Sequence, residues 1–129
     1  MTTVTTTGTT TYAVLLPGDE SVWEAAGPEE RAATYARHEE FSRLLAERGH
    51  TVVGGAELTH SRTAKVVRAG ADGPVVSDGP YAETVEQLSG FYLVQSDDLD
   101  DLLELCALLA GEDGGVEVRA TVDHEGDPA

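Results

Sequence analysis

The sequence predicts an α+β domain of the ferredoxin-like kind, a split βαβ unit with an added hairpin. Short apolar, β-prone segments and two amphipathic helical patterns follow one another in the order strand, helix, strand, hairpin, strand, helix, strand. The 129 residues, 40% of them hydrophobic, suffice for one core, and we find no repeat or linker. We therefore expect one domain over residues 12–122, between a flexible Thr-rich leader at 1–11 and an acidic tail at 123–129.

The first elements are a strand and a helix. Residues 12–16 are apolar and stop at Pro17-Gly18, which is typical of a central strand that ends in a turn. The helix begins near Pro28, because proline and the carboxylates that follow it suit a first helical turn, and it ends at Gly49. Its expected apolar stripe consists of Tyr35, His38, Phe41, Leu44 and Leu45.

A strand and a hairpin come next. Within the strand at residues 50–58, Gly54-Gly55 indicates a bulge or a close backbone approach. Residues 63–68 and 74–77 flank a turn at 71–73, which predicts a hairpin whose turn needs the positive φ of glycine.

The last elements are a strand, a helix and a final strand. Residues 91–94 form the strand, and Asp97 and Asp98 then cap the helix. Alternation of apolar and polar residues predicts the final strand at 116–121. The expected stripe of this second helix is Leu99, Leu102, Leu103, Cys106 and Leu109.

Charge and composition disfavour several classes of partner. A net charge of −16 disfavours nucleic acids and anionic membranes, although it also fits a salt-adapted host or a basic protein partner. No apolar run reaches the ~20 residues of a membrane span, and the Thr-rich start lacks the features of a signal peptide, so we expect a cytoplasmic protein. The lone cysteine, Cys106, is expected to be a buried hydrophobe.

Two helices cover only one face of such a sheet, whose other face also carries apolar side chains. Packing the open faces of two sheets together would bury both and enclose a cavity. The sequence therefore predicts a homodimer around a small-molecule cleft.

The segment DGPYAETVEQLSGFYLV at residues 78–94 resembles the signature of the YCII-related or DGPF family. The resemblance extends over nearly all of residues 12–122. This sequence differs from the usual pattern at Tyr81, where the family has Phe, and at Ser89, where Gly is common. The added Tyr81 hydroxyl needs water or a partner.

The resemblance implies a dimeric α+β barrel whose cleft holds a His on the first helix and an acid nearby. His38 matches the family's histidine. Members of the family are implicated in cofactor-free lyase, dehydrochlorinase or isomerase reactions on small ring compounds, and some are encoded beside extracytoplasmic-function sigma factors.

His38 and Asp78 are the candidate catalytic pair. An imidazole on an apolar stripe can exchange a proton near neutral pH, and Asp78 would orient it, stabilise its charge or act as a base itself. The structural alternatives are a histidine at the edge of the core and a carboxylate that shapes a tight turn. Candidate substrate-binding residues are Tyr81, Glu83 and Tyr92, although Glu83 can equally face solvent and Tyr92 can lie in a dimer contact.

No metal ligand pattern links the four histidines, so we expect no metal, and no cofactor motif is present. The leading hypothesis is a cofactor-independent lyase or isomerase that acts on a small metabolite. The alternative is a non-enzymatic regulatory or ligand-sensing module with a sigma factor as partner.

Overall fold

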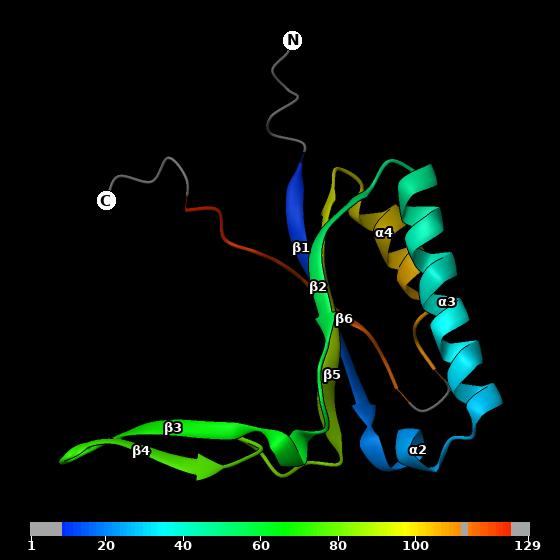
Figure 1. The fold of residues 1–129 in the computed structure, drawn as a ribbon. Coiled ribbons are helices and arrows are strands. Elements are labelled where there is room, and N and C mark those ends of the chain that lie inside the picture. Colours follow the sequence, from blue (N-terminus) through cyan, green and yellow to red (C-terminus); the bar gives the residue numbers. More distant parts are fainter. Residues whose placement is uncertain (1–8, 112–113, 125–129) are drawn as a thin grey trace.

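The computed structural model describes residues 9–111 and 114–124, which form a sheet with two helices packed on one face (Figure 1). The four-stranded sheet has the order β2-β5-β1-β6, and each neighbouring pair is antiparallel. This is the ferredoxin-like α+β fold that the order of the elements predicts. The elements are β1 (Thr10–Asp19), α2 (Glu20–Ala25), α3 (Pro28–Glu47), β2 (Thr51–Glu57), η1 (Ser61–Thr63), β3 (Lys65–Gly70), β4 (Gly73–Asp78), β5 (Glu86–Ser96), α4 (Leu99–Cys106) and β6 (Glu117–Ala120).

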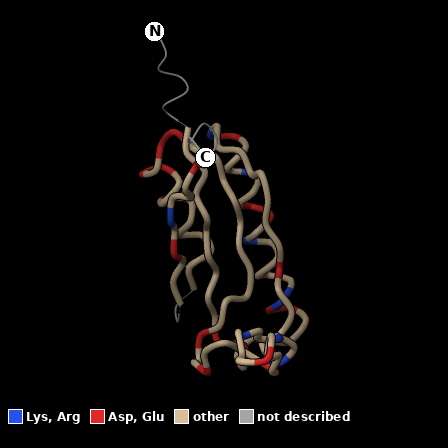
Figure 2. The backbone as a smooth tube through the Cα atoms, turned by 90° about the vertical axis from the view of Figure 1, so that its left-hand side faces the viewer, with Lys and Arg blue, Asp and Glu red and all other residues tan. Residues whose placement is uncertain are grey.

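The central strands β1 and β5 divide the sheet into a covered face and an open face. Val14 pairs with Tyr92, and both pack toward the core beneath the helices. Because side chains alternate along a strand, the next pair, Leu15 and Phe91, points to the opposite face. Residues 10–18 and 87–96 contain no charged side chain, so the centre of the sheet is uncharged (Figure 2).

The predicted irregularity at Gly54-Gly55 is confirmed. The register of β2 against β5 shifts between Val52 and Gly54, and Gly55 has a φ of +146°. A Cβ atom at Gly55 would lie 2.5 Å from the carbonyl oxygen of Phe91, so only glycine fits there. The bulge adds one residue to β2 relative to β5 and bends the edge strand locally.

The hairpin of β3 and β4 forms a separate two-stranded sheet. Gly73 has a φ of +120°, as the predicted turn requires. The hairpin projects from the main sheet on the side opposite to the helices (Figure 1). It therefore reaches out over the open face.

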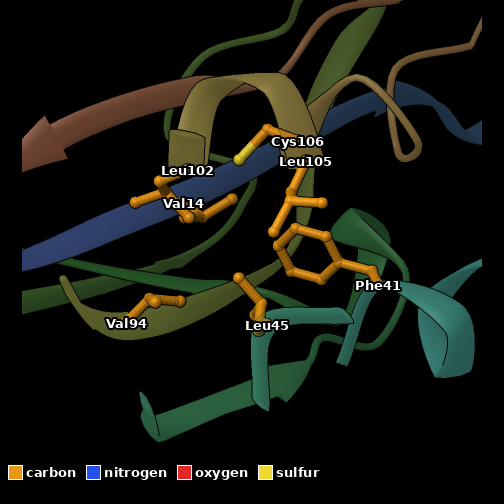
Figure 3. Close-up of a cluster of buried hydrophobic side chains, with 7 residues drawn as sticks. All are labelled: Val14, Phe41, Leu45, Val94, Leu102, Leu105 and Cys106. Carbon is orange, nitrogen blue, oxygen red and sulfur yellow. The ribbon is translucent and has the colours of Figure 1, made fainter. Parts of the chain in front are cut away.

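The core lies between the covered face and the two helices (Figure 3). Phe41 and Leu45 of α3, at i and i+4, are fully buried against this face. The predicted stripe of α4 was partly wrong: Leu99 and Leu103 are exposed, whereas Leu105 is buried. The helix is only two turns long, and its buried face is set by the 102, 105, 106 spacing. The core cluster comprises Val14, Phe41, Leu45, Val94, Leu102, Leu105 and Cys106.

Cys106 is buried, as predicted, and burial raises the pKa of its thiol to about 11. A thiol in this state is a poor nucleophile, so Cys106 serves packing.

Two further findings concern the ends and the short elements of the chain. The short helix α2 was not predicted; the Asp19 carboxylate caps it by accepting from the Ser21 N–H.

No helix in the described residues is long and apolar enough to cross a membrane. Most of the predicted leader and tail, residues 1–8 and 125–129, lies outside the described residues.

Candidate functional site

His38 and Tyr92 form a hydrogen-bonded pair at the contact between α3 and the sheet. The Nδ1 atom of His38 lies 2.7 Å from the Tyr92 hydroxyl, and both side chains are half-buried. The Phe41 ring packs on Tyr92 with 5.3 Å between ring centroids. Because Phe41 lies one turn after His38 on α3, the buried core on one side fixes the position of the pair.

The electrostatic environment keeps both members of this pair neutral near pH 7. Burial lowers the pKa of His38 below its ordinary 6.5; the charge of Arg37 adds to this effect and that of Glu57 opposes it. Burial also raises the pKa of Tyr92, against a smaller lowering effect of Ser42. The pair therefore combines a neutral imidazole with an intact phenol.

The pair opens on a pocket of about 610 Å³ lined by Tyr35, His38, Glu39, Ser42 and Tyr92. The Tyr35 hydroxyl donates to the carboxylate of Glu57 at 3.2 Å, which ties α3 to the edge strand β2 at this pocket. No described residue bonds to the second ring nitrogen of His38, Nε2. We call this the His38 pocket.

Asp78 does not meet His38 within the described part of the chain. It ends β4 on the projecting hairpin, and its carboxylate lies 2.5 Å from the Lys65 ammonium. This hydrogen bond and the lysine charge lower the pKa of Asp78. The nearby carboxylate charge of Glu57 raises the pKa of His38, against the larger lowering effect of burial.

The three predicted substrate-binding residues are separated. Tyr92 lines the His38 pocket, whereas Tyr81 lines a second pocket at the base of the hairpin. Glu83 lies in the exposed loop between β4 and β5 and lines neither pocket. The second pocket, here the hairpin-base pocket, has a volume of about 570 Å³.

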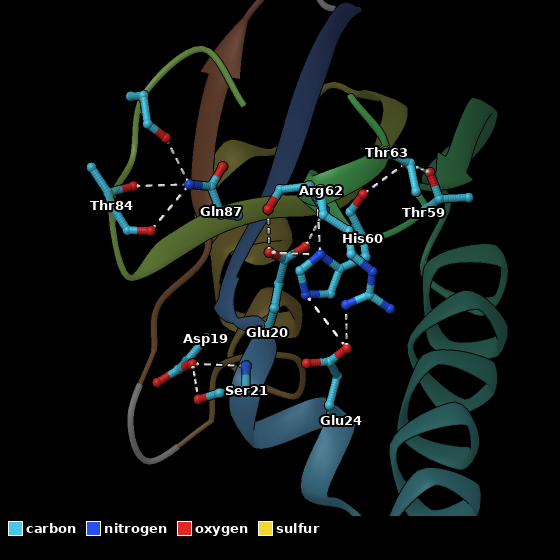
Figure 4. A network of polar contacts seen from close by, with 12 residues as sticks. Asp19, Glu20, Ser21, Glu24, Thr59, His60, Arg62, Thr63, Thr84 and Gln87 are labelled. Carbon is cyan, nitrogen blue, oxygen red and sulfur yellow. Dashed lines mark hydrogen bonds and ion pairs between the residues drawn. The ribbon is translucent and has the colours of Figure 1, made fainter. Parts of the chain in front are cut away.

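A polar network holds the wall of the hairpin-base pocket (Figure 4). The carboxylate of Glu20 accepts from the backbone and the hydroxyl of Ser61 at 2.7 and 2.5 Å. His60 caps η1 by accepting from the Arg62 N–H at Nδ1, and its Nε2 lies 3.6 Å from the carboxylate of Glu24. Both ring nitrogens of His60 thus face groups of the protein, and the network fastens η1 to α2.

A chain of Ser96, His50 and Asp101 has the residue types of a hydrolase triad. The two ring nitrogens of His50 lie 2.8 Å from the Ser96 hydroxyl and 2.8 Å from the Asp101 carboxylate. The Ser96 hydroxyl is buried and also bonds both backbone groups of Asp98. Ser96 lines neither pocket, so its hydroxyl is not placed to attack a substrate. The three hydrogen-bonded residues instead fasten the start of β2 to α4.

Within residues 9–111 and 114–124, no group of three or more His, Cys, Asp or Glu side chains is arranged to hold a metal ion.

Comparison with known proteins defines the family. The profile of the YCII-related domain matches residues 10–123, which include the whole sheet and the helices α3 and α4. The chain belongs to the YCII-related family. An uncharacterized protein of Rhizobium meliloti (strain 1021) is 37% identical over 111 residues, covering 84% of this chain and 89% of the relative.

Within this YCII-related chain, the sequence did not predict Tyr35, Glu39 and Ser42 as lining residues of the His38 pocket, or Glu57 as the partner of Tyr35. Tyr35 and Ser42 lie three positions before and four positions after His38, so helical spacing places them on the same face of the helix as His38. Glu57 meets the Tyr35 hydroxyl only through the register of β2 against β5, which a bulge shifts by one residue. No sequence pattern reveals that register.

Proposed function

We propose that this YCII-related protein is a lyase or isomerase that needs no cofactor. It binds a small metabolite in the His38 pocket, and His38 removes a proton from one atom of that metabolite and returns it at another. The observation that carries the proposal is the hydrogen bond between His38 and Tyr92 beside a pocket. A half-buried imidazole with a lowered pKa is unprotonated at neutral pH, which a general base requires.

The two nitrogens of His38 have different roles in this proposal. Tyr92 holds Nδ1 and fixes the orientation of the ring, which leaves Nε2 to take a proton from the substrate. With Nδ1–H donating to the phenol, Nε2 carries the lone pair that abstracts the proton. The resulting imidazolium returns the proton at another atom of the substrate in an isomerisation, or gives it to the leaving group in an elimination.

A homodimer formed through the open sheet faces is the second part of the proposal. By strand alternation, Ala13, Leu15, Phe91 and Leu93 share the open face, and the adjacent hairpin exposes Val67, Val75 and Val76. A monomer would leave this uncharged surface in water. The predicted meeting of Asp78 with His38 is not made within one chain and stays a prediction for the dimer.

A metabolite library tests the enzymatic proposal. The wild-type protein is incubated with the library, and compounds are followed by mass spectrometry. We expect at least one compound to be converted, and we expect His38→Gln to lower the rate by about 10²–10⁴-fold, the usual contribution of a general acid or base. Equal rates for the two proteins would overturn the role of His38.

A ligand-sensing or regulatory module in the cytoplasm, with a sigma factor as partner, is the alternative. The net charge of −16 favours a basic partner. This function predicts that some compounds of the library bind to the wild-type protein and that none of them is converted.

A further inference from the structure

The hairpin-base pocket combines an apolar wall with the only lysine of the chain. Leu58, Val66, Pro80 and Leu88 supply the wall, and Lys65 and Tyr81 lie among the polar lining residues. Its volume of about 570 Å³ falls within the roughly 300–1,000 Å³ of ordinary ligand pockets. The His38 pocket lies elsewhere and shares no lining residue with it.

Several cationic side chains lie beside this pocket, although Arg62 is paired with Glu24 and Lys65 with Asp78. Three of the eight Lys and Arg residues, Arg62, Lys65 and Arg68, fall within seven positions of η1 and β3. The guanidinium of Arg68 lies over the Tyr81 ring, 5.4 Å from its centroid. This arrangement places a cation against an aromatic ring at the rim of the pocket.

Lys65 has capacity for a second anionic partner. An ammonium group has three N–H donors, and among the described residues only Asp78 bonds to that of Lys65. Both side chains of this ion pair are mostly exposed, so water screens the pair and it holds Lys65 weakly. A ligand carboxylate can therefore share the ammonium with Asp78 or replace it.

We propose that the hairpin-base pocket binds a small carboxylate with a flat apolar ring. The carboxylate pairs with Lys65, and the ring packs between Tyr81 and the wall of Val66 and Leu88. The network of Glu20, His60 and Ser61 keeps η1 in place, so the wall is formed before the ligand arrives. This site is separate from the His38 pocket and does not depend on its proposed chemistry.

Benzoate, benzyl alcohol and benzylamine form a probe set of similar shape and different charge. Each is titrated into the full-length protein, and backbone amide resonances map its position. We expect benzoate to shift resonances of residues 58–67 and 80–88, and to bind at least tenfold more tightly than benzyl alcohol or benzylamine. Benzoate shifts confined to the surroundings of His38, or tighter binding of benzylamine, would overturn the proposal.

Two variants and one control isolate the lysine. Lys65→Gln should weaken benzoate binding at least tenfold, and Asp78→Asn should strengthen it because a competing carboxylate is removed. Arg119→Gln, an exposed change on β6 away from the pocket, should leave the affinity unchanged. Unchanged affinity in Lys65→Gln would show that the lysine does not bind the probe, which contradicts the proposal whether or not His38 proves to be catalytic.

Discussion

The Tyr92 hydroxyl on β5 lies 2.7 Å from Nδ1 of His38 on α3, and 54 positions separate the two residues in the sequence. The bond exists only because α3 packs on the covered face of the sheet through Phe41 and Leu45. The packing of α3 therefore sets the geometry of the site, and substitutions of Phe41 or Leu45 should disturb the hydrogen bond between His38 and Tyr92.

The titration of His38 should show the effect of burial. We expect an NMR pKa below 6.5, which Arg37→Gln raises and Glu57→Gln lowers further, because these charges act in opposite directions. Since the folded state binds this proton less readily than the unfolded chain, the contribution of His38 lowers stability as the pH falls through 6.5 toward the folded pKa. A pKa of His38 above 6.5 would contradict the described environment.

Tyr92→Phe should lose one hydrogen bond and keep the packing on Phe41. We expect the free energy of unfolding to fall by about 0.5–1.5 kcal/mol. Tyr12→Phe is a matched control, because Tyr12 also packs against the core and its hydroxyl has no hydrogen bond to a described residue. Urea denaturation compares the two, and equal losses would argue against the His38 bond.

Phe41→Ala should destabilise the protein more than a change at an exposed valine. The side chain is fully buried between α3 and Tyr92, so we expect a loss of about 3–5 kcal/mol. Val85→Ala, in the exposed loop before β5, should change stability by no more than about 0.5 kcal/mol. Thermal unfolding of both variants measures the difference, and a Phe41→Ala loss as small as that of Val85→Ala would contradict the packing.

Gly55→Ala should disturb the edge strand. Its φ of +146° and the 2.5 Å approach to the Phe91 carbonyl force a shift of β2, with a cost of at least about 1–3 kcal/mol. Gly111→Ala adds its Cβ to open space and should leave stability nearly unchanged. Similar unfolding midpoints for the two variants would show that β2 tolerates a side chain at the bulge.

The open sheet face should carry the homodimer. Light scattering after size-exclusion chromatography should give twice the chain mass of 13.6 kDa for the wild-type protein and the single mass for Leu93→Glu. Glu39→Lys, at the His38 pocket on the helix side of the sheet, serves as the control because it also changes a charge away from the open face and should leave the dimer intact. A monomeric wild-type protein at micromolar concentration would contradict the proposed assembly.

The sequence predicted the fold because the signals for its elements are local. Pro28 and Gly49 mark the limits of α3, Asp98 caps α4, and Gly73 makes the hairpin turn; each acts within a few residues. The buried face of α4 was harder to predict, because Leu102, Leu103 and Leu105 fall within four positions and allow more than one stripe, and only packing selects Leu105.

Local signals also predicted individual residues of the site but not the contacts between them. His38 and Tyr92 were both identified as candidates, but their pairing depends on how α3 lies over β5. Within one chain the Asp78 carboxylate bonds to Lys65, and its contact with His38 stays a prediction for the dimer. Contacts between distant elements follow from packing and register, which periodicity does not encode.

Solvent deuterium exchange tests the acid–base role of His38 most directly. A panel of small carbonyl compounds is incubated with the protein in deuterated water, and deuterium gained at carbon is measured by mass spectrometry. The proposed function predicts exchange into at least one compound by the wild-type protein, and a rate lower by about 10²–10⁴-fold with His38→Gln. Equal exchange with the wild-type protein and His38→Gln would contradict it.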